Sequence, residues 1–544
     1  MLISRINIIH CLFLALLCFI CYANSTHNPF IWDDESLIVN NQTLHDWRNI
    51  SFFFTPNAWP TDFSNFYRPL QLVSYCIDYQ VWRLNPFGYH LTNILIHTFN
   101  CILLYVLLVL LLHHGWASFI GSMIFTVHPL HVEAVTYISG RADLLAAFFI
   151  LFFFITYTIT AKHFEINERE SFVRLSFRVI VLIISFLCAL GSKESAIIIP
   201  LMLIVWHLFL FDIKAKTVLL ISFISCGFIS LVYGIWRMQG TVFNMFDIYS
   251  FSFIERFSVA VKSFALYCAL IVAPIGLHME RMIMPPEKYF EISFLFSLLW
   301  VLVFIIALVW IIRKSRIASL GLLWFVVMLL PVLNIVPLNA TFAEHWMYLP
   351  FIGLSIGTGV LILKIKPLIH KNILIWVIVF LVIIFSARTI IRNRDWHDPI
   401  HFYEETLRYN PTNIKILYNL GTAHLKAQNA ESAINRYRNI ISVVAFKPLI
   451  TKGGGSRLLL RRLLTKVYNN MGNAFVLKED YEMALNYYGK SLELSPNHEL
   501  SHLNLAMLYY RTGRIKEARE QFLEVLKLNP HNEKAQLYLE RLKN

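Results

Sequence analysis

Residues 2–23, LISRINIIHCLFLALLCFICYA, form an apolar run that is followed by the acidic motif Phe30-Ile31-Trp32-Asp33-Asp34-Glu35. About 20 apolar residues suffice for a helix to cross the hydrocarbon core, so the run is long enough to span a membrane. The three carboxylates then lie just outside the membrane, where closely spaced acids resist full ionisation. One of them can serve as a general base or a ligand, although an isolated Asp-Asp-Glu is more often a solvated turn.

The apolar run is interpreted as an uncleaved anchor, because many further spans follow it. The alternative is a cleaved signal peptide that ends near Ala23-Asn24-Ser25. In either case residues 24–68 emerge on the far side of the membrane as a first outer loop. This loop is polar and rich in Trp and Phe, as expected of a segment that lies at the membrane interface.

The composition excludes an ordinary soluble protein, because 57% of the 544 residues are apolar and only 15% are charged. The net charge of +13 would suit nucleic-acid binding, but many Lys and Arg residues fall between apolar runs, where they set membrane topology instead. We therefore expect no nucleic-acid partner. The eight Cys residues show no disulfide framework, and the CxxC spacing of Cys18 and Cys21 lies within a membrane run.

Eleven later apolar runs have spanning length, and they centre on 90–112, 117–130, 141–161, 175–190, 195–211, 217–236, 258–275, 292–312, 317–333, 346–363 and 373–391. Lys and Arg residues cluster at 162–178, 214–216, 313–316 and 364–371, and the positive-inside rule places all four clusters in the cytoplasm. An even number of crossings must then separate residues 216 and 313, whereas three runs lie there. We therefore predict that 258–275, which contains Lys262, is re-entrant. Eleven full crossings remain, with the amino terminus inside and the carboxyl half outside.

Beyond Arg392 the apolar runs stop and a 34-residue rhythm begins. Ala484 and Ala518 are 34 residues apart, and so are Pro496 and Pro530. This is the period of tetratricopeptide repeats, in which small residues lie where two helices touch. The rhythm predicts stacked helix pairs whose curved surface binds peptides or partner proteins.

An earlier copy of the repeat covers residues 418–448, with Ala433 at the packing position. Ala433 and Ala484 are 51 residues apart, so about half a repeat is inserted near residues 449–466. The insertion contains three glycines and a basic run, namely Gly453-Gly454-Gly455 and Arg457, Arg461, Arg462 and Lys466. We interpret it as a flexible loop with a lengthened helix, in preference to a contact with lipid phosphate.

These patterns predict an all-α chain with three parts. A polytopic membrane domain covers residues 1–391, a connector covers 392–412, and a tetratricopeptide-repeat domain covers 413–544. The repeats contain no grouping of acid, base and anion binder, so we expect the chemistry in the membrane domain. No phosphate-binding loop, zinc-ligand spacing or nucleophile elbow occurs in the sequence.

Three further polar motifs fall on the same predicted outer face as Asp33. They are Tyr67-Arg68-Pro69-Leu70 with Gly88–His97, then His128-Pro129-Leu130-His131-Val132-Glu133 with Ser139-Gly140-Arg141-Ala142-Asp143, and finally Ala343-Glu344-His345-Trp346-Met347-Tyr348-Leu349-Pro350. Polar groups held at membrane segments are costly and mark function by default. Each motif taken alone is as compatible with an interfacial anchor as with a functional site.

Together these motifs resemble the transmembrane and tetratricopeptide repeat-containing proteins. The resemblance is carried by Phe30-Ile-Trp-Asp-Asp34, Tyr67-Arg-Pro-Leu70, His90-Leu-Thr-Asn-Ile-Leu-Ile-His97, His128-Pro-Leu-His-Val-Glu-Ala134 and Ser139-Gly-Arg-Ala-Asp-Leu-Leu145. The stretch Glu344-His-Trp-Met-Tyr-Leu-Pro350 is similar to that family's Glu-Arg-Tyr-Leu-Tyr-Leu-Pro, with His345 in place of the Arg. The resemblance covers nearly the whole chain.

The resemblance implies a glycosyltransferase of the GT-C type, related to the protein O-mannosyltransferases. Such a protein transfers a sugar, a hexose such as mannose, from a polyprenyl phosphate to a hydroxyl of a protein or glycan on the non-cytoplasmic side. The acidic pair in the first outer loop is then the catalytic element, which corresponds here to Asp33 and Asp34. The implied location is a bacterial inner membrane with periplasmic repeats, or an endoplasmic reticulum membrane with lumenal repeats.

The residue types suit this chemistry on their own terms. A carboxylate that takes the acceptor's proton contributes roughly 10²–10⁴-fold to the rate, and the anionic phosphate that leaves needs cations beside it. As the resemblance suggests, we favour Asp33, the first acid after the Trp, as the base, with Asp34 or Glu35 placing the acceptor. The predicted substrate-binding residues are Glu35, Arg68, His90, His128, His131, Glu133, Arg141, Asp143 and Glu344. Among them Arg68, Arg141, His90 and His131 are the candidate phosphate contacts, with Lys193 as a further candidate.

Other hypotheses belong to different classes. One is a non-enzymatic membrane scaffold whose repeats assemble an envelope complex, and another is a transporter. A transporter would carry polar residues along several spans, whereas here they concentrate at the outer ends. The expected partners are membrane lipid, the lipid-linked sugar and a protein bound by the repeats. A divalent metal held by Asp and His is compatible with the residue types, but no ligand spacing supports one.

Overall fold

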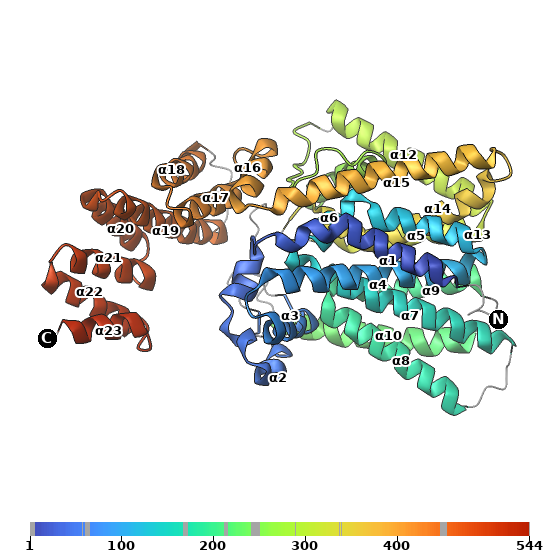
Figure 1. The fold of residues 1–544 in the computed structure, drawn as a ribbon, viewed down its shortest axis with the longest axis horizontal. Coiled ribbons are helices and arrows are strands. Elements are labelled where there is room, and N and C mark those ends of the chain that lie inside the picture. The colour runs from blue at the N-terminus through green and yellow to red at the C-terminus, as the bar shows by residue number, and fades with distance from the viewer. Residues whose placement is uncertain are drawn as a thin grey trace. The chain divides into compact units, whose positions relative to one another are not determined.

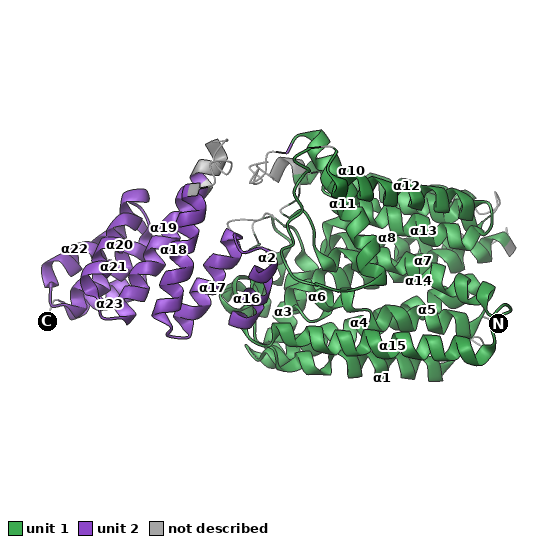
Figure 2. Ribbon diagram, turned by 90° about the horizontal axis from the view of Figure 1, so that it is seen from above, with its two compact units in different colours: residues 1–243, 252–398 green, residues 244–251, 399–544 purple. Residues whose placement is uncertain are grey.

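The computed structural model describes residues 6–56, 58–59, 66–166, 172–211, 216–240, 251–288, 290–336, 338, 340–446 and 454–542. Every regular element within these ranges is helical, which confirms the predicted all-α fold (Figure 1). Lys214 and Gly453, which entered the sequence analysis, lie outside the described residues. Two compact units are present, a membrane unit of residues 1–243 and 252–398 and a repeat unit of residues 244–251 and 399–544 (Figure 2).

The membrane unit contains fifteen described α-helices. They are α1 (Ile8–Tyr22), α2 (Ile50–Phe53), α3 (Pro69–Trp82), α4 (Pro86–Leu112), α5 (Gly115–Val127), α6 (Val132–Val135), α7 (Arg141–Ile166), α8 (Phe172–Ser192), α9 (Ile199–Leu210), α10 (Lys216–Gly240), α11 (Phe253–Val272), α12 (Ile292–Ile312), α13 (Arg316–Leu329), α14 (Tyr348–Ile365) and α15 (Lys371–Asn393). Short helical turns connect them, including η3 (Glu35–Val39), η6 (Pro129–His131), η7 (Ile138–Gly140), η8 (Glu194–Ile198), η11 (Glu344–Met347) and η12 (Arg394–Trp396).

Among the described residues, eight helical stretches are long and apolar enough to cross a membrane. They are Ile8–His27, Pro86–Leu112, Ile138–Glu165, Val173–Ser192, Lys216–Arg237, Ile292–Ile312, Glu344–Ile365 and Lys371–Trp396. Three shorter apolar helices cover Gly115–Val127, Glu194–Leu210 and Arg316–Val332. These eleven coincide with the eleven predicted crossings. The run predicted to be re-entrant corresponds to α11, which is not among the candidate spans.

The membrane helices bring the acidic motif and the other outer motifs to one end of the bundle, the acidic end. The Ser139 amide beside the start of α7 donates to Asp34 at 2.9 Å, and α8 returns to the same end because Lys193 pairs with Asp143 at 2.6 Å. Likewise α14 starts beside Glu133, and α15 ends there. The end of α7, the start of α8, the end of α14 and the start of α15, which carry Lys and Arg residues of two of the basic clusters, therefore lie at the opposite end.

Close helix contacts in the membrane unit depend on small residues. A Cβ added at Gly353 of α14 would lie 2.2 Å from the carbonyl oxygen of Gly321 on α13. Lipid supplies no hydrophobic driving force between helices, so close approach and van der Waals contact hold them together. The α13–α14 pair is therefore a tight backbone-to-backbone interface.

The repeat unit consists of antiparallel helix pairs. Its helices are α16 (Pro399–Tyr409), α17 (Ile414–Lys426), α18 (Ala430–Phe446), α19 (Gly454–Leu477), α20 (Tyr481–Leu494), α21 (Glu499–Arg511), α22 (Ile515–Leu528) and α23 (Glu533–Arg541). The three alanines used to detect the repeats, Ala433, Ala484 and Ala518, are fully buried. Small residues thus lie where the helices touch, as the 34-residue period predicts.

Two parts of the repeat unit refine the sequence analysis. The stretch predicted to be a connector, residues 392–412, contains α16, and this helix belongs to the same compact unit as the repeats. The inserted segment continues as α19, which has 24 residues, whereas α17 and α21 have 13 each. The insertion therefore lengthens a helix, as interpreted from the sequence.

Candidate active site

The two aspartates of the acidic motif have opposite environments. Asp34 is buried, and its carboxylate accepts hydrogen bonds from the Ser139 amide at 2.9 Å, the Ser139 hydroxyl at 2.5 Å and the Ile31 amide at 3.2 Å. Burial raises the pKa of Asp34 to about 7, although these hydrogen bonds oppose the shift. Asp33 is exposed, and its backbone amide donates to the Tyr137 hydroxyl at 3.3 Å.

The backbone at Trp32 separates these two carboxylates. Trp32 has a φ of 64°, which is an unusual conformation for a bulky residue and persists only when the surroundings fix it. Trp32 and Asp34 are buried, so the turn directs Asp33 outward while it anchors its neighbour. Glu35 begins η3 and is partly exposed on the same turn. The local geometry therefore leaves Asp33 exposed and uses Asp34 to hold the loop.

Arg141 forms a buried polar cluster behind this loop. Its guanidinium pairs with Asp78 at 2.6 Å and donates to the Asn93 side chain and the Tyr89 carbonyl, each at 2.8 Å. It also lies over the ring of Tyr75 at 4.6 Å. The side chain has no exposed surface. In this geometry Arg141 holds α3, α4 and α7 together through protein partners, and its contact with a donor phosphate stays a prediction.

A second polar cluster joins the start of α3 to the end of α8. Lys193 donates to both carboxylate oxygens of Asp143, at 2.6 and 2.7 Å, and both side chains are buried. Beside them Arg68 pairs with Glu194 at 3.0 Å, and Glu194 also accepts from the Tyr67 amide at 3.1 Å. Arg68 is the more exposed of the two cations, and it lies over the ring of Phe66 at 4.1 Å.

A third cluster surrounds the start of α14. Glu133 accepts from the Glu344 amide at 2.9 Å and contacts the His345 ring nitrogen Nδ1 at 2.7 Å. Burial raises the pKa of Glu133, but His345 and Arg392 outweigh burial and hold it below the ordinary value. Glu344 is fully buried, lies 3.6 Å from Arg392 and accepts from the His278 amide at 2.6 Å. Glu133 and Glu344 therefore fix the α14 start, as their buried positions require partners.

Asn393 at the end of α15 ties these clusters to the first outer loop. Its side chain accepts from Thr136 at 2.8 Å and donates to the Cys21 carbonyl at 2.8 Å and to the Asn24 side chain at 2.7 Å. Its carbonyl accepts from the Asn28 side chain at 3.1 Å. Asn393 is fully buried, and its hydrogen bonds hold the first outer loop against the last membrane helix. We call this residue the hub.

An aromatic contact extends the hub to Asp33. The ring of Trp396 stacks on Tyr137, with centroids 5.2 Å apart, and the Tyr137 hydroxyl accepts from the Asp33 amide. Arg392, Asn393 and Trp396 were not singled out in the sequence. The only signal for them is a group of polar residues that ends an apolar run.

The predicted histidines are all buried. His90 lies 3.0 Å from the Asn28 carbonyl, and His128 lies 3.0 Å from the Ile271 carbonyl at the end of α11. Burial lowers the pKa of His128 to about 4 and that of His131 well below its ordinary value. Within the described part of the chain, neither ring nitrogen of His131 has a hydrogen-bond partner. Neutral, enclosed histidines do not supply the cation that a leaving phosphate needs.

The structure thus brings all the predicted site residues to one end of the bundle and divides them by exposure. Asp33, Glu35 and Arg68 retain exposed surface, whereas the other predicted residues are buried, and four of these, Glu133, Arg141, Asp143 and Glu344, lie in the three polar clusters. In the described residues no group of three or more His, Cys, Asp or Glu side chains is arranged to hold a metal ion. The arrangement suits a proton acceptor on a rigid support.

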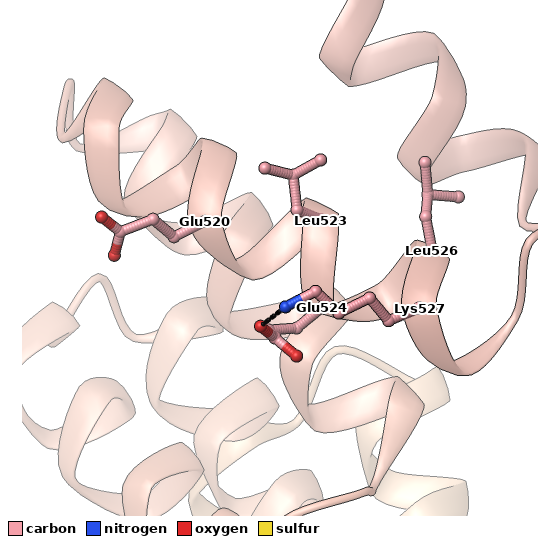
Figure 3. Close-up of a pocket in the computed structure, with 5 residues that line it drawn as sticks. All are labelled: Glu520, Leu523, Glu524, Leu526 and Lys527. Carbon is pink, nitrogen blue, oxygen red and sulfur yellow. Dashed lines mark hydrogen bonds and ion pairs between the residues drawn. The ribbon is translucent and has the colours of Figure 1, made fainter.

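A hollow of about 410 Å³ lies on the repeat unit, far in sequence from these motifs. It is lined by Glu520, Leu523, Glu524, Leu526 and Lys527, all on α22 (Figure 3). Glu524 and Lys527 pair across one helical turn at 2.6 Å. The hollow is open along a single helix. Its five lining residues do not form a group of acid, base and anion-binding side chains.

The tetratricopeptide repeat family model matches residues 463–530, which confirms the repeats. Over 570 aligned residues the chain is 24% identical to protein O-mannosyl-transferase TMTC3 of Homo sapiens, covering 94% of this chain and 59% of that protein. It is 26% identical to protein O-mannosyl-transferase TMTC4 of Mus musculus, covering 77% and 64%. It is 25% identical to protein O-mannosyl-transferase F38B6.6 of Caenorhabditis elegans, covering 75% and 59%.

These similarities confirm the resemblance to the transmembrane and tetratricopeptide repeat-containing proteins. The chain spans about 60% of the length of these relatives. Together with the eight candidate spans, they identify a multi-pass membrane protein with tetratricopeptide repeats.

Proposed function

We propose that this chain is a membrane glycosyltransferase that moves a mannosyl group from a polyprenyl-phosphate donor to a hydroxyl of a protein acceptor. The names of its relatives support the reaction class and the protein acceptor. The polar end of a membrane bundle supports a donor that is itself lodged in the membrane. A water-soluble nucleotide sugar would not require such a site.

In the proposed step the acceptor oxygen attacks the anomeric carbon of the sugar. The carbon–oxygen bond to the phosphate breaks, the new glycosidic bond forms, and the acceptor proton passes to the carboxylate of Asp33. The polyprenyl phosphate leaves with the electron pair of the broken bond. A positioned general base contributes roughly 10²–10⁴-fold to such a reaction.

One observation carries the assignment of the base, namely the contrast between exposed Asp33 and buried Asp34. A general base must reach the proton that it removes. Asp34 already accepts three hydrogen bonds from the protein and lies out of reach of a substrate. Asp33 is exposed on a turn that Asp34, Ser139 and Tyr137 hold in place, so it is accessible and preorganised.

The repeats are proposed to select the protein acceptor. Stacked tetratricopeptide helices present an extended surface for a partner chain. The described helices α16 to α23 contain no grouping of acid, base and anion binder, so the bond-making step is assigned to the membrane unit.

The experiment compares Asp33→Asn with the wild-type chain in a transfer assay that uses a lipid-linked mannose donor and an acceptor peptide. Asn keeps the size and hydrogen bonding of Asp33 but cannot take the proton, so turnover should fall by roughly two to four powers of ten. Thermal unfolding should be unchanged because Asp33 is exposed. Gln42→Ala, at an exposed position in the same outer loop, is the matched control, and it should transfer at the wild-type rate.

The scaffold hypothesis makes the opposite prediction for the same variants. A non-enzymatic scaffold would tolerate Asp33→Asn in any functional assay and would depend on the repeats alone. Wild-type transfer by Asp33→Asn would therefore remove the proposed base and favour the scaffold.

A further inference from the structure

The segment that follows α11 presents an apolar tip beside two arginines. Val272 and Ile275 are among the most exposed large apolar side chains of the membrane unit, at 78% and 76% exposure. Exposed apolar residues at the end of a membrane bundle contact lipid acyl chains or another apolar molecule. We therefore expect Val272 and Ile275 to contact lipid at the acidic end of the bundle.

Arg388 of α15 lies next to this tip. Its Nε donates to the Pro274 carbonyl at 3.4 Å, and the side chain is half-buried within the candidate span Lys371–Trp396. Ile384 and Ile391 on the same helix are exposed, at 43% and 52%. Among the described residues the two terminal guanidinium nitrogens of Arg388 have no partner. A cation in such an apolar setting is costly unless an anion joins it.

A second guanidinium holds the neighbouring carbonyl of the same segment. Arg281 donates to the Gly276 carbonyl at 2.5 Å, lies 3.2 Å from the His278 ring and lies over the Phe342 ring at 5.6 Å. The arginine is half-buried. Pro274 and Gly276 are two residues apart, so the two guanidinium groups are anchored on adjacent parts of one short segment.

The segment is rigidly attached to the core of the membrane unit. His128 contacts the Ile271 carbonyl at 3.0 Å on one side and the ring of Phe385 on α15 at 4.7 Å on the other. Arg388 follows Phe385 by three residues, which is about one helical turn. The arginine therefore projects from a helix whose position relative to the α11 end is fixed by His128.

Three acids around the end of α15 and the start of α14 already have partners. Glu133 holds His345 and the start of α14, Glu344 holds the His278 amide and lies near Arg392, and Asp395 pairs with Arg392 at 2.6 Å. None of these contacts involves Arg388. Arg281 and Arg388 thus place two cations beside the apolar tip, where Glu280 is the adjoining acid in the sequence. Guanidinium groups bind phosphate with paired hydrogen bonds.

We propose that Arg281 and Arg388, with Val272 and Ile275, form a binding site for a lipid phosphate. The guanidinium groups take the phosphate oxygens, and the two exposed apolar side chains contact the lipid chain. The assignment of this lipid as the polyprenyl-phosphate donor rests on the proposed function, and a phospholipid headgroup shares the same chemistry. Asn393, which holds the acidic loop, follows Arg388 by five residues, about 7.5 Å along the helix.

The site is tested by titrating the full chain in detergent with farnesyl phosphate, using farnesol as the ligand that lacks the anion. Arg388→Gln and Arg281→Gln remove one charge each and keep the hydrogen-bonding shape. Loss of a charge-assisted hydrogen bond should weaken farnesyl phosphate binding by about 10-fold to 100-fold and leave farnesol binding unchanged. Arg388→Lys should weaken binding less than Arg388→Gln, because it keeps the charge but loses the paired hydrogen bonds.

The matched control is Arg313→Gln, which removes an exposed Arg from the opposite end of the bundle. It should bind like the wild type. Thermal unfolding of each variant identifies any that has lost its fold. If folded Arg388→Gln and Arg281→Gln both bind farnesyl phosphate like the wild type, the site is overturned.

Competition by phosphatidylglycerol separates the two sources of the phosphate. Failure of this phospholipid to displace farnesyl phosphate supports the donor, whereas displacement at equal concentration overturns the donor assignment and supports a headgroup site. Asp33→Asn should bind farnesyl phosphate normally while transfer is lost. Binding without transfer in the wild-type chain would contradict the proposed function and leave the phosphate site intact.

Discussion

The membrane unit and the repeat unit place their ion pairs differently. In the membrane unit the Arg141–Asp78 pair has side-chain exposures of 0% and 7%, and Lys193–Asp143 is buried as well. In the repeat unit the Lys527–Glu524 pair has exposures of 69% and 43% and joins residues three apart on one helix. Buried ion pairs fix the geometry around them, whereas exposed ion pairs between neighbours on one helix add little to the free energy of folding.

This difference reflects how each unit acquires a unique structure. The repeats pack small residues against aromatic rings on neighbouring helices, so they need no buried charge. The acidic end of the membrane unit consists of irregular segments that must hold one shape without regular helix packing. Buried ion pairs with several hydrogen bonds supply that shape, at a desolvation cost that such pairs only partly recover.

The comparison is tested most strongly by Arg141→Met. This variant leaves Asp78 buried without its partner, which should lower the free energy of unfolding of the membrane unit by about 3–5 kcal/mol. The measurement is denaturant unfolding of the full chain in detergent. Lys527→Met in the repeat unit is the control, and its unfolding should match the wild type. Equal losses for the two variants would contradict the contrast between the units.

A smaller effect is expected from Gly472→Ala in the repeat unit. A Cβ at this position on α19 would lie 2.4 Å from a ring carbon of Tyr488 on α20, so the ring or the helix must shift, at a cost of about 1–3 kcal/mol. Gly489→Ala on α20 is the matched control, because nothing lies within 4 Å of its Cβ. That variant should be stabilised by up to about 1 kcal/mol. Thermal unfolding of the repeat unit is the measurement.

Gly472→Ala would refute the packing account if it unfolded like the wild type. A loss of stability in Gly489→Ala as large as in Gly472→Ala would also show that the Tyr488 contact does not decide the result.

The smallest expected effect concerns pH and Asp34. Its pKa is about 7 in the folded chain and ordinary, near 3.8, when unfolded. Between about pH 4 and pH 7 the folded state therefore binds more protons, and the contribution of Asp34 to stability falls as pH rises through this window. Unfolding of the wild type and of Asp34→Asn, measured at several pH values, should differ in slope within the window. Parallel curves would show that Asp34 does not titrate there.

Much of the fold follows from the sequence, because its signals are local. Each apolar run is long enough to form a helix by itself, and the 34-residue period places Ala484 and Ala518 at equivalent helix contacts. The grouping of the outer motifs at one end also follows, because alternate crossings and basic links define two ends. The burial of Ala484 and Ala518 agrees with the predicted packing.

The details of the candidate site do not follow from local signals. Asp33 and Asp34 are adjacent in the sequence, and only the positive φ of Trp32 and a contact with Ser139, 105 residues away, give them different environments. Arg388 is a single charged residue near the end of an apolar run and matches no motif. Its importance depends on the Pro274 carbonyl, which is 114 residues distant.

The hub at Asn393 has a consequence for the order in which the chain matures during synthesis. Asn28 and Asn393 are 365 residues apart, so the first outer loop lacks its anchor until the last membrane helix has been made. At roughly 5–20 residues per second, a ribosome needs about 20–70 s to cover that distance. Throughout this interval the acidic motif has been synthesised but lacks this anchor. A nascent chain that stops before α15 would thus present Asp33 without the support that orients it, and such fragments should be open to proteolysis.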